Sequence, residues 1–161
     1  MMNILKTINL PQKMLNDFFA IHWGSPQMVI SSGVYKCSEL DGYAVVNTEN
    51  QIIGLITYVF LKNQCEIISL DSLEEGKGIG TILLQEVELN ARRHRCDRVA
   101  LVTTNDNLPA LRFYQKRGFQ LVKVYRNAVA RAREIKPEIP LIGIDGIPIR
   151  DEIELEKRLD R

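Results

Sequence analysis

Runs of apolar residues predict three consecutive strands in the first half of the chain. Residues 43–47 and 52–61 are rich in β-branched and aromatic side chains, and the polar stretch 48–51 between them is typical of a hairpin turn. Residues 65–70 form a third run of the same kind. We therefore expect three antiparallel strands ahead of the glycine-rich segment that follows.

An amphipathic helix is predicted over residues 78–93, directly after that glycine-rich segment. Apolar side chains recur there at helical spacing, with polar ones between them. The apolar stripe consists of Ile79, Ile82, Leu83, Val87 and Ala91. Residues 98–104 then form a short apolar run that predicts a buried strand. Together the segments predict a strand–helix–strand unit with a right-handed crossover.

A second, shorter helix is bounded on both sides by residues with a known positional preference. Asn107 is a good N-cap, Pro109 falls in the first turn, and Gly118 suits the position after the last turn. A strand over residues 119–125 follows. Near the end, residues 152–158 alternate between charged and apolar residues, and this period of two favours a strand, although their composition favours a helix.

Size, composition and charge narrow the class of protein. A chain of 161 residues, 45% hydrophobic and 25% charged, predicts a single globular domain over residues 1–161. The formal net charge of +1 argues against recruitment of nucleic acid, and no apolar run is long enough to span a membrane. We expect a cytoplasmic location, because no signal peptide is evident; the sequence leaves a homodimer open.

Neither a disulfide framework nor a metal site is indicated. The three cysteines, Cys37, Cys65 and Cys96, are far apart and lack the spacing of a zinc site. We interpret them as reduced packing residues. The stretch 136–148 is the only one whose Pro and Gly content resembles a linker, but its isoleucines predict that it packs.

The segment between the third strand and the long helix carries the most informative chemistry. It reads Glu75, Gly76, Lys77, Gly78, Ile79, Gly80 and Thr81. Glycines permit close approach of the backbone to a ligand, and the first turn of a helix favours an anion. The segment lacks both the Gly-Lys-Ser/Thr ending of a Walker A loop and the GxGxxG spacing of dinucleotide binders. A tight connection without any ligand is the alternative interpretation.

Two motifs in this order resemble those of the GNAT N-acetyltransferase superfamily. The family signature Gln/Arg-x-x-Gly-x-Gly/Ala is matched from Glu75 to Gly80, with Glu75 departing from the usual Gln or Arg. A second family element is matched by Asn107, Ala110, Tyr114, Gly118 and Phe119. The resemblance is firm over residues 65–125. It implies a mixed α/β (α+β) fold with a twisted, mostly antiparallel sheet, a splayed parallel pair formed by the fourth and fifth strands, and helices on both faces.

The resemblance also implies a role for particular residues. Acetyl-coenzyme A is the expected cofactor, with its pyrophosphate on the amides of residues 75–81 and its pantetheine arm beside Leu70 and Asn107. Tyr114 matches the tyrosine beside the cofactor sulfur, which is often the general acid. Residues 127–161 are then expected to complete the sheet and are a candidate for part of the acceptor site.

Acetyl transfer to an amine also needs a group that removes a proton from the nitrogen, because a free amine is mostly protonated at neutral pH. Glu66 is the first candidate, since family members use a glutamate on this strand; a solvent-facing charge is the alternative. Asp71 and Glu74 lie nearer the loop. No Cys-His pair argues for a covalent enzyme intermediate, so we expect direct attack.

Two further segments receive weaker functional interpretations. His22 and Trp23 lie in a segment from which family members build the acceptor pocket. The alternative interpretation is that Trp23 is an ordinary packing residue. The basic run Arg92, Arg93, His94 and Arg95 is explained by the end of the long helix, where cations are favoured. The chain is therefore expected to acetylate a primary amine of a small molecule or protein. The alternative, encouraged by Glu75, is a module that binds acyl-CoA without turnover.

Overall fold

The computed structural model describes residues 2–160 and divides into two compact units. The first comprises Met1–Met28, Tyr35–Val99 and Leu159–Arg161, and the second comprises Val29–Val34 and Ala100–Arg158. Each unit is considered by itself, and the expectation of a single domain stays a prediction. No helix of the described part of the chain is long and apolar enough to cross a membrane.

The first unit is built on four antiparallel strands. Their order is β1 (Asn3–Lys6), β4 (Asp41–Val46), β5 (Ile52–Leu61) and β6 (Gln64–Ser72). The three strands predicted from the sequence are β4, β5 and β6, so this part of the prediction is confirmed. Between β4 and β5, the side chain of Asn47 accepts hydrogen bonds from the backbone of Glu49 and Gln51, which closes the predicted turn.

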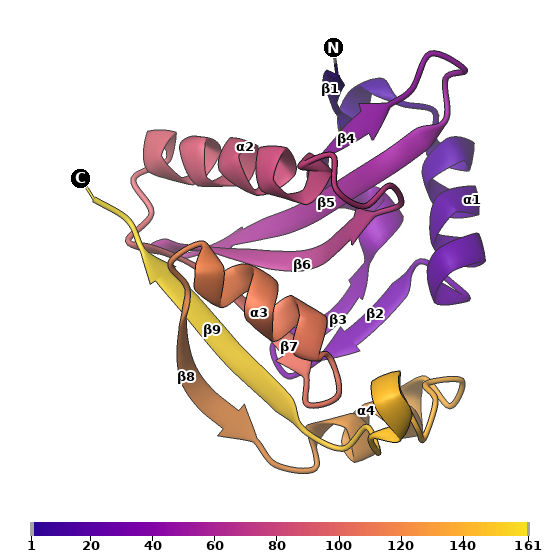
Figure 1. Ribbon diagram of the computed structural model, residues 1–161, viewed down its shortest axis with the longest axis vertical. Helices are drawn as coiled ribbons and strands as arrows, with labels where there is room; N and C mark the ends of the chain where they lie inside the picture. The colour runs from indigo at the N-terminus through magenta and orange to yellow at the C-terminus, as the bar shows by residue number, and fades with distance from the viewer. Residues whose placement is uncertain (1, 161) are drawn as a thin grey trace. The chain divides into compact units, whose positions relative to one another are not determined.

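Two helices cover opposite faces of these strands. Helix α2 (Ile79–Arg93) packs on one face, and Figure 1 shows it running across β4, β5 and β6. Gly54 permits this packing, because a Cβ atom there would collide with the side chain of Ile79. Helix α1 (Gln12–Trp23) contacts Asp71, which pairs with Leu55. Successive residues of a strand point to opposite faces, so α1 lies on the face away from α2.

Strand β6 contains one extra residue relative to its neighbour. Ser69 pairs with Thr57 and Ile67 pairs with Tyr58, which leaves Ile68 without a partner on β5. A β-bulge of this kind bends the strand and is frequent beside functional sites. The bulge also decides which side chains share a face: Glu66, Ser69 and Asp71 all project away from α2.

The second unit contains three strands in the order β7 (Arg98–Thr104), β9 (Glu152–Arg158) and β8 (Gln120–Tyr125). Strands β8 and β9 are antiparallel, so the predicted final strand is confirmed. The short helix predicted after Asn107 is α3 (Leu108–Lys116), and Gly118 follows it with a φ of +94°. The remaining helix is α4 (Ala128–Ile135), and 3-10 turns occupy Thr7–Asn9, Cys37–Glu39 and Ile144–Gly146. Strands β2 (Gln27–Ile30) and β3 (Gly33–Lys36) form a separate hairpin.

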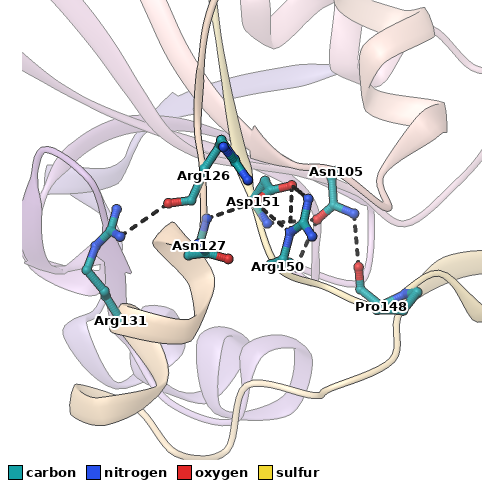
Figure 2. A network of polar contacts seen from close by, with 7 residues as sticks. All are labelled: Asn105, Arg126, Asn127, Arg131, Pro148, Arg150 and Asp151. Carbon is teal, nitrogen blue, oxygen red and sulfur yellow. Dashed lines mark hydrogen bonds and ion pairs between the residues drawn. The ribbon is translucent and has the colours of Figure 1, made fainter.

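The long connection between β8 and β9 is held by the buried apolar residues of α4 and by hydrogen bonds to side chains. Asn105 binds the carbonyl of Pro148 and the amides of Arg150 and Asp151, while the Asp151 carboxylate accepts the amide of Asn127 (Figure 2). The prediction that the isoleucines of residues 136–148 pack is wrong for Ile142 and Ile144, which are 55% and 41% exposed, because this stretch is attached by polar contacts such as that of Asn105 with Pro148. The three cysteines are free thiols and all are buried.

Candidate functional site

The loop between β6 and α2 is open and carries no side-chain cap. Gly76 and Gly78 adopt φ values of +77° and +72°, a region that favours glycine. Apart from the glycines themselves and their chain neighbours, no atom of the described residues lies within 4 Å of the position that a Cβ would take at either residue. Gly78 is the N-cap of α2, so the amides of the first turn start without a side-chain acceptor. The loop therefore leaves room for an anion beside the helix start.

The charged side chains of the loop point to solvent or to each other. Lys77 forms an ion pair with Glu74, with 3.2 Å between Nζ and Oε2, and Glu75 is exposed. The paired Lys77 is therefore already partly neutralised. Since the Glu75 side chain is surrounded by solvent, its repulsion of a bound phosphate is screened.

Within the first unit, β6 holds two further predicted residues. Leu70 is half-buried and pairs with Ile56. Glu66 is only 5% exposed, so its alternative interpretation as a solvent-facing charge is wrong. Thr57 and Ser69 form a buried hydroxyl pair at 2.6 Å on the same face of the strands as Glu66. That face therefore presents a row of polar groups along β6.

Asp71 contributes to the same row and is joined to α1. The indole N–H of Trp23 donates a hydrogen bond of 2.9 Å to Oδ2 of Asp71. Burial raises the pKa of Asp71 above its usual value, while the bond from Trp23 and the nearby His22 act in the opposite direction. The sequence suggested His22 and Trp23 together and Asp71 separately, and the structure brings Trp23 and Asp71 into contact. Trp23 and Asp71 are 48 positions apart, so no local pattern reveals their contact.

Within the second unit, α3 carries the other two predicted residues. The side-chain oxygen of Asn107 accepts the amide of Ala110 at 3.2 Å, which confirms its role as the N-cap. Tyr114 is 6% exposed, and its ring makes edge contacts with Phe113 and Phe119. The helix therefore fixes the direction of the Tyr114 side chain through packing.

Asn105 and Asp106, which sequence analysis did not single out, hold the segment that precedes α3. Asp106 is 4% exposed, and its carboxylate accepts the hydroxyl of Thr104 and the amide of Ile144. In the sequence, the run of polar residues directly after the buried strand β7 could have indicated that Asn105 and Asp106 have a structural role. These contacts link the start of α3 to the connection between β8 and β9 in the same unit.

Comparisons with known proteins agree with this geometry. The model of the Acetyltransferase (GNAT) family matches residues 11–119. The protein YxbD of Bacillus subtilis (strain 168) is 56% identical over 158 residues, which cover 98% of this chain and 99% of YxbD.

Solved structures share the fold. An IAA acetyltransferase from Bacillus cereus ATCC 14579 superposes with a TM-score of 0.71 at 20% identity, covering 99% of this chain and 100% of that one. A GNAT family acetyltransferase from Elizabethkingia anophelis with acetyl-CoA bound reaches a TM-score of 0.63 at 27% identity, covering 76% and 78%. The mixed α/β fold class and the resemblance drawn from the two motifs are confirmed. The chain belongs to the GNAT family of acetyltransferases.

Proposed function

We propose that the protein binds acetyl-coenzyme A and transfers its acetyl group to a primary amine of a small molecule or protein. The observation that carries this proposal is the open start of α2, where Gly76 and Gly78 leave space beside uncapped amides. A helix start of this kind favours a phosphate through both its N–H groups and its dipole. The acetyl-CoA bound to the related protein of E. anophelis supports the same cofactor.

The cofactor is assigned to the residues that match the family motifs. The amides of residues 75–81 bind the pyrophosphate, and the backbone at Leu70 binds the pantetheine arm. The Asn107 side-chain oxygen is occupied by the amide of Ala110, so its NH₂ group is the part that remains to donate to the cofactor arm. Acetyl-coenzyme A supplies the reactive thioester carbon.

In the transfer step, the amine nitrogen attacks the thioester carbon, a C–N bond forms and the C–S bond breaks. Tyr114 donates its phenolic proton to the departing sulfur, and Glu66 accepts a proton from the nitrogen. The place of Glu66 in the row of polar groups along β6, on the same face as Ser69 and Asp71, supports this assignment. Asp71, Glu74 or a chain of water molecules are the alternative routes for that proton.

The choice of base is open to a direct test. If Glu66 is the base, Glu66→Gln lowers turnover, and raising the pH restores part of it because more of the amine is already neutral. Absence of that rescue would point to one of the alternative routes.

A second candidate function is binding of acyl-CoA without turnover, and Glu75 at the usual Gln or Arg position favours it. A thiol-release assay with acetyl-CoA and a panel of amines separates the two candidates. The proposed enzyme releases thiol only when a suitable amine is present. Tight binding of acetyl-CoA with no release across the panel would instead support the binding module.

A further inference from the structure

The first unit contains a recess at the end of α2 that lies away from the loop after β6. The recess has a volume of about 290 Å³, at the small end of ligand pockets, which hold roughly 300–1,000 Å³. It is lined by β1, the 3-10 turn Thr7–Asn9, β4, β5 and the last turn of α2. Helix α2 has 15 residues and rises about 22 Å, which separates the recess from the loop at the other end of the helix (Figure 1).

The floor of the recess consists of side chains that point from the strands toward α2. The side-chain amide of Asn90 on α2 donates a hydrogen bond of 2.8 Å to the hydroxyl of Tyr58, so Tyr58 projects toward the helix. Asp41 lies opposite Tyr58 on β4, and Lys6 of β1 lies opposite Tyr43. Directly opposite residues share a face, as do residues two positions apart on one strand. Lys6, Asp41 and Tyr43 therefore project to the same side as Tyr58.

Aromatic rings hold one another in place around the recess. Tyr43 and Tyr58 stack with 6.0 Å between their ring centroids, and Phe60 stacks on the His94 imidazole at 4.5 Å. Burial raises the pKa of Tyr58, and the neighbouring Tyr43 and Asp41 act in the same direction, so the Tyr58 phenol stays neutral. The recess is thus formed before any ligand enters, which lowers the entropic cost of binding.

Charged side chains of both signs border the recess. Lys6, Asp41 and Arg93 are exposed, and none of them takes part in an ion pair among residues 2–160. The carbonyl end of α2 carries a partial charge of about −0.5, less than the charge of the two cations. The apolar side chain of Ile8, which also lines the recess, is 81% exposed. The recess therefore offers cations, a carboxylate and an apolar surface to one ligand.

We propose that this recess binds a free α-amino acid with an apolar side chain. The carboxylate of the amino acid faces Lys6 and Arg93, its ammonium group donates to the Asp41 carboxylate, and its side chain covers Ile8. A simple carboxylate would leave Asp41 as a repelling charge, and a simple amine would meet two cations. The inference concerns a second site and does not rest on the proposed acetyl transfer.

The test measures binding to the full chain by calorimetry with three matched probes. Leucine is compared with 3-methylbutylamine, which lacks the carboxylate, and with 4-methylpentanoate, which lacks the ammonium group. We expect the wild type to bind leucine more tightly than either of the other two. This preference is the first requirement of the proposal.

Two variants then remove the opposite charges one at a time. Lys6→Gln and Asp41→Asn should each weaken leucine binding by about 5- to 10-fold, between the range for an exposed ion pair and that for a hydrogen bond to a charged group. Lys6→Gln should not weaken binding of 3-methylbutylamine, and Asp41→Asn should not weaken binding of 4-methylpentanoate. This crossed pattern distinguishes loss of a specific contact from general destabilisation of the protein.

The matched controls are Lys13→Gln and Asp17→Asn on α1. Lys13 and Asp17 pair with each other at 2.7 Å and do not line the recess, so these variants lose the same charges elsewhere and should bind the probes like the wild type. Arg93→Gln, in the exposed last turn of α2, should repeat the Lys6→Gln pattern and serves if a strand variant does not fold. Absence of leucine binding at millimolar concentration, equal binding of the three probes by the wild type, or leucine binding that the folded recess variants leave unchanged would overturn the inference.

Discussion

Helices α2 and α3 begin in opposite ways. Helix α2 starts after Gly78, which has a positive φ and offers no side chain to the first-turn amides. Helix α3 starts after Asn107, whose side-chain oxygen already accepts the amide of Ala110. Both helices follow a strand and both carry residues of the family motifs (Figure 1). Of these two helices, only α2 therefore leaves its first-turn amides to an external anion.

The difference separates two tasks. The backbone amides at the start of α2 are suited to binding the cofactor. Helix α3 is capped and packed, so it is suited to fixing the orientation of its side chains. Tyr114, near the end of α3, is fixed by ring contacts with Phe113 and Phe119. Variants at the two helices should accordingly affect different steps, and the following predictions test that division.

The largest effect is expected at Tyr114. Tyr114→Phe keeps the ring and its packing but removes the proton donor, and loss of a positioned general acid lowers rates by about 10² to 10⁴. We expect kcat to fall while the KM for acetyl-CoA is nearly unchanged, as for an interaction made mainly in the transition state. Steady-state kinetics under conditions where chemistry limits the rate provide the measurement. An unchanged kcat would reduce Tyr114 to a packing residue.

Gly78→Val should show the complementary pattern, with loss of cofactor binding. A β-branched residue at a φ of +72° is strained by about 1–3 kcal/mol, and its side chain would occupy the space that we propose for the pyrophosphate. The control is Gly146→Val, because Gly146 has a φ of +76° and equally open space around its Cβ position. Thermal unfolding with and without acetyl-CoA should show that both variants lose stability and that only Gly78→Val loses stabilisation by the cofactor. Normal binding by folded Gly78→Val would contradict the assignment of the loop.

Asn107 allows its two functions to be separated. Asn107→Ala removes the cap and should lower stability by about 1 kcal/mol, whereas Asn107→Asp keeps an oxygen for the amide of Ala110. Asn107→Asp nevertheless lacks the NH₂ group, so it should weaken acetyl-CoA binding without loss of stability. Chemical denaturation and equilibrium binding measure the two effects. If both variants bind acetyl-CoA like the wild type, Asn107 is a cap and nothing more.

The smallest effect is expected at Glu75. Replacing it with Gln removes one negative charge near the loop, but the side chain is exposed and its field is screened. We expect acetyl-CoA to bind more tightly by about fivefold or less, with a larger gain at low salt. A loss of affinity would indicate that the Glu75 carboxylate contributes to binding.

The parts that could be predicted are those set by local sequence. The positive φ values of Gly76 and Gly78 favour glycine, so the glycine-rich loop could be predicted from the sequence. The alternation over residues 152–158 correctly predicts β9, in which Leu155 is fully buried. Asn107 and Gly118 likewise mark the two ends of α3 by their own conformational preferences.

The parts that could not be predicted depend on contacts between distant positions. Helix α4 begins after Asn127, whose amide is held by Asp151, and its buried residues Ala128, Val129 and Ala132 span little more than one turn, too short a stretch for periodicity to indicate a helix. Glu152 looks like part of a solvent-facing row, yet it is 3% exposed because its carboxylate accepts the amide and hydroxyl of Ser31. The contact of Trp23 with Asp71 is of the same kind.

Thermal unfolding with added acetyl-CoA tests most directly the central claim, that the open start of α2 holds this cofactor. A ligand that binds only the folded state stabilises it by mass action, roughly 2.7 kcal/mol at one hundred times its Kd. We predict a rise in Tm with acetyl-CoA that neither NAD nor ATP reproduces. Absence of any shift with acetyl-CoA and longer acyl-CoA compounds at millimolar concentration would contradict the account.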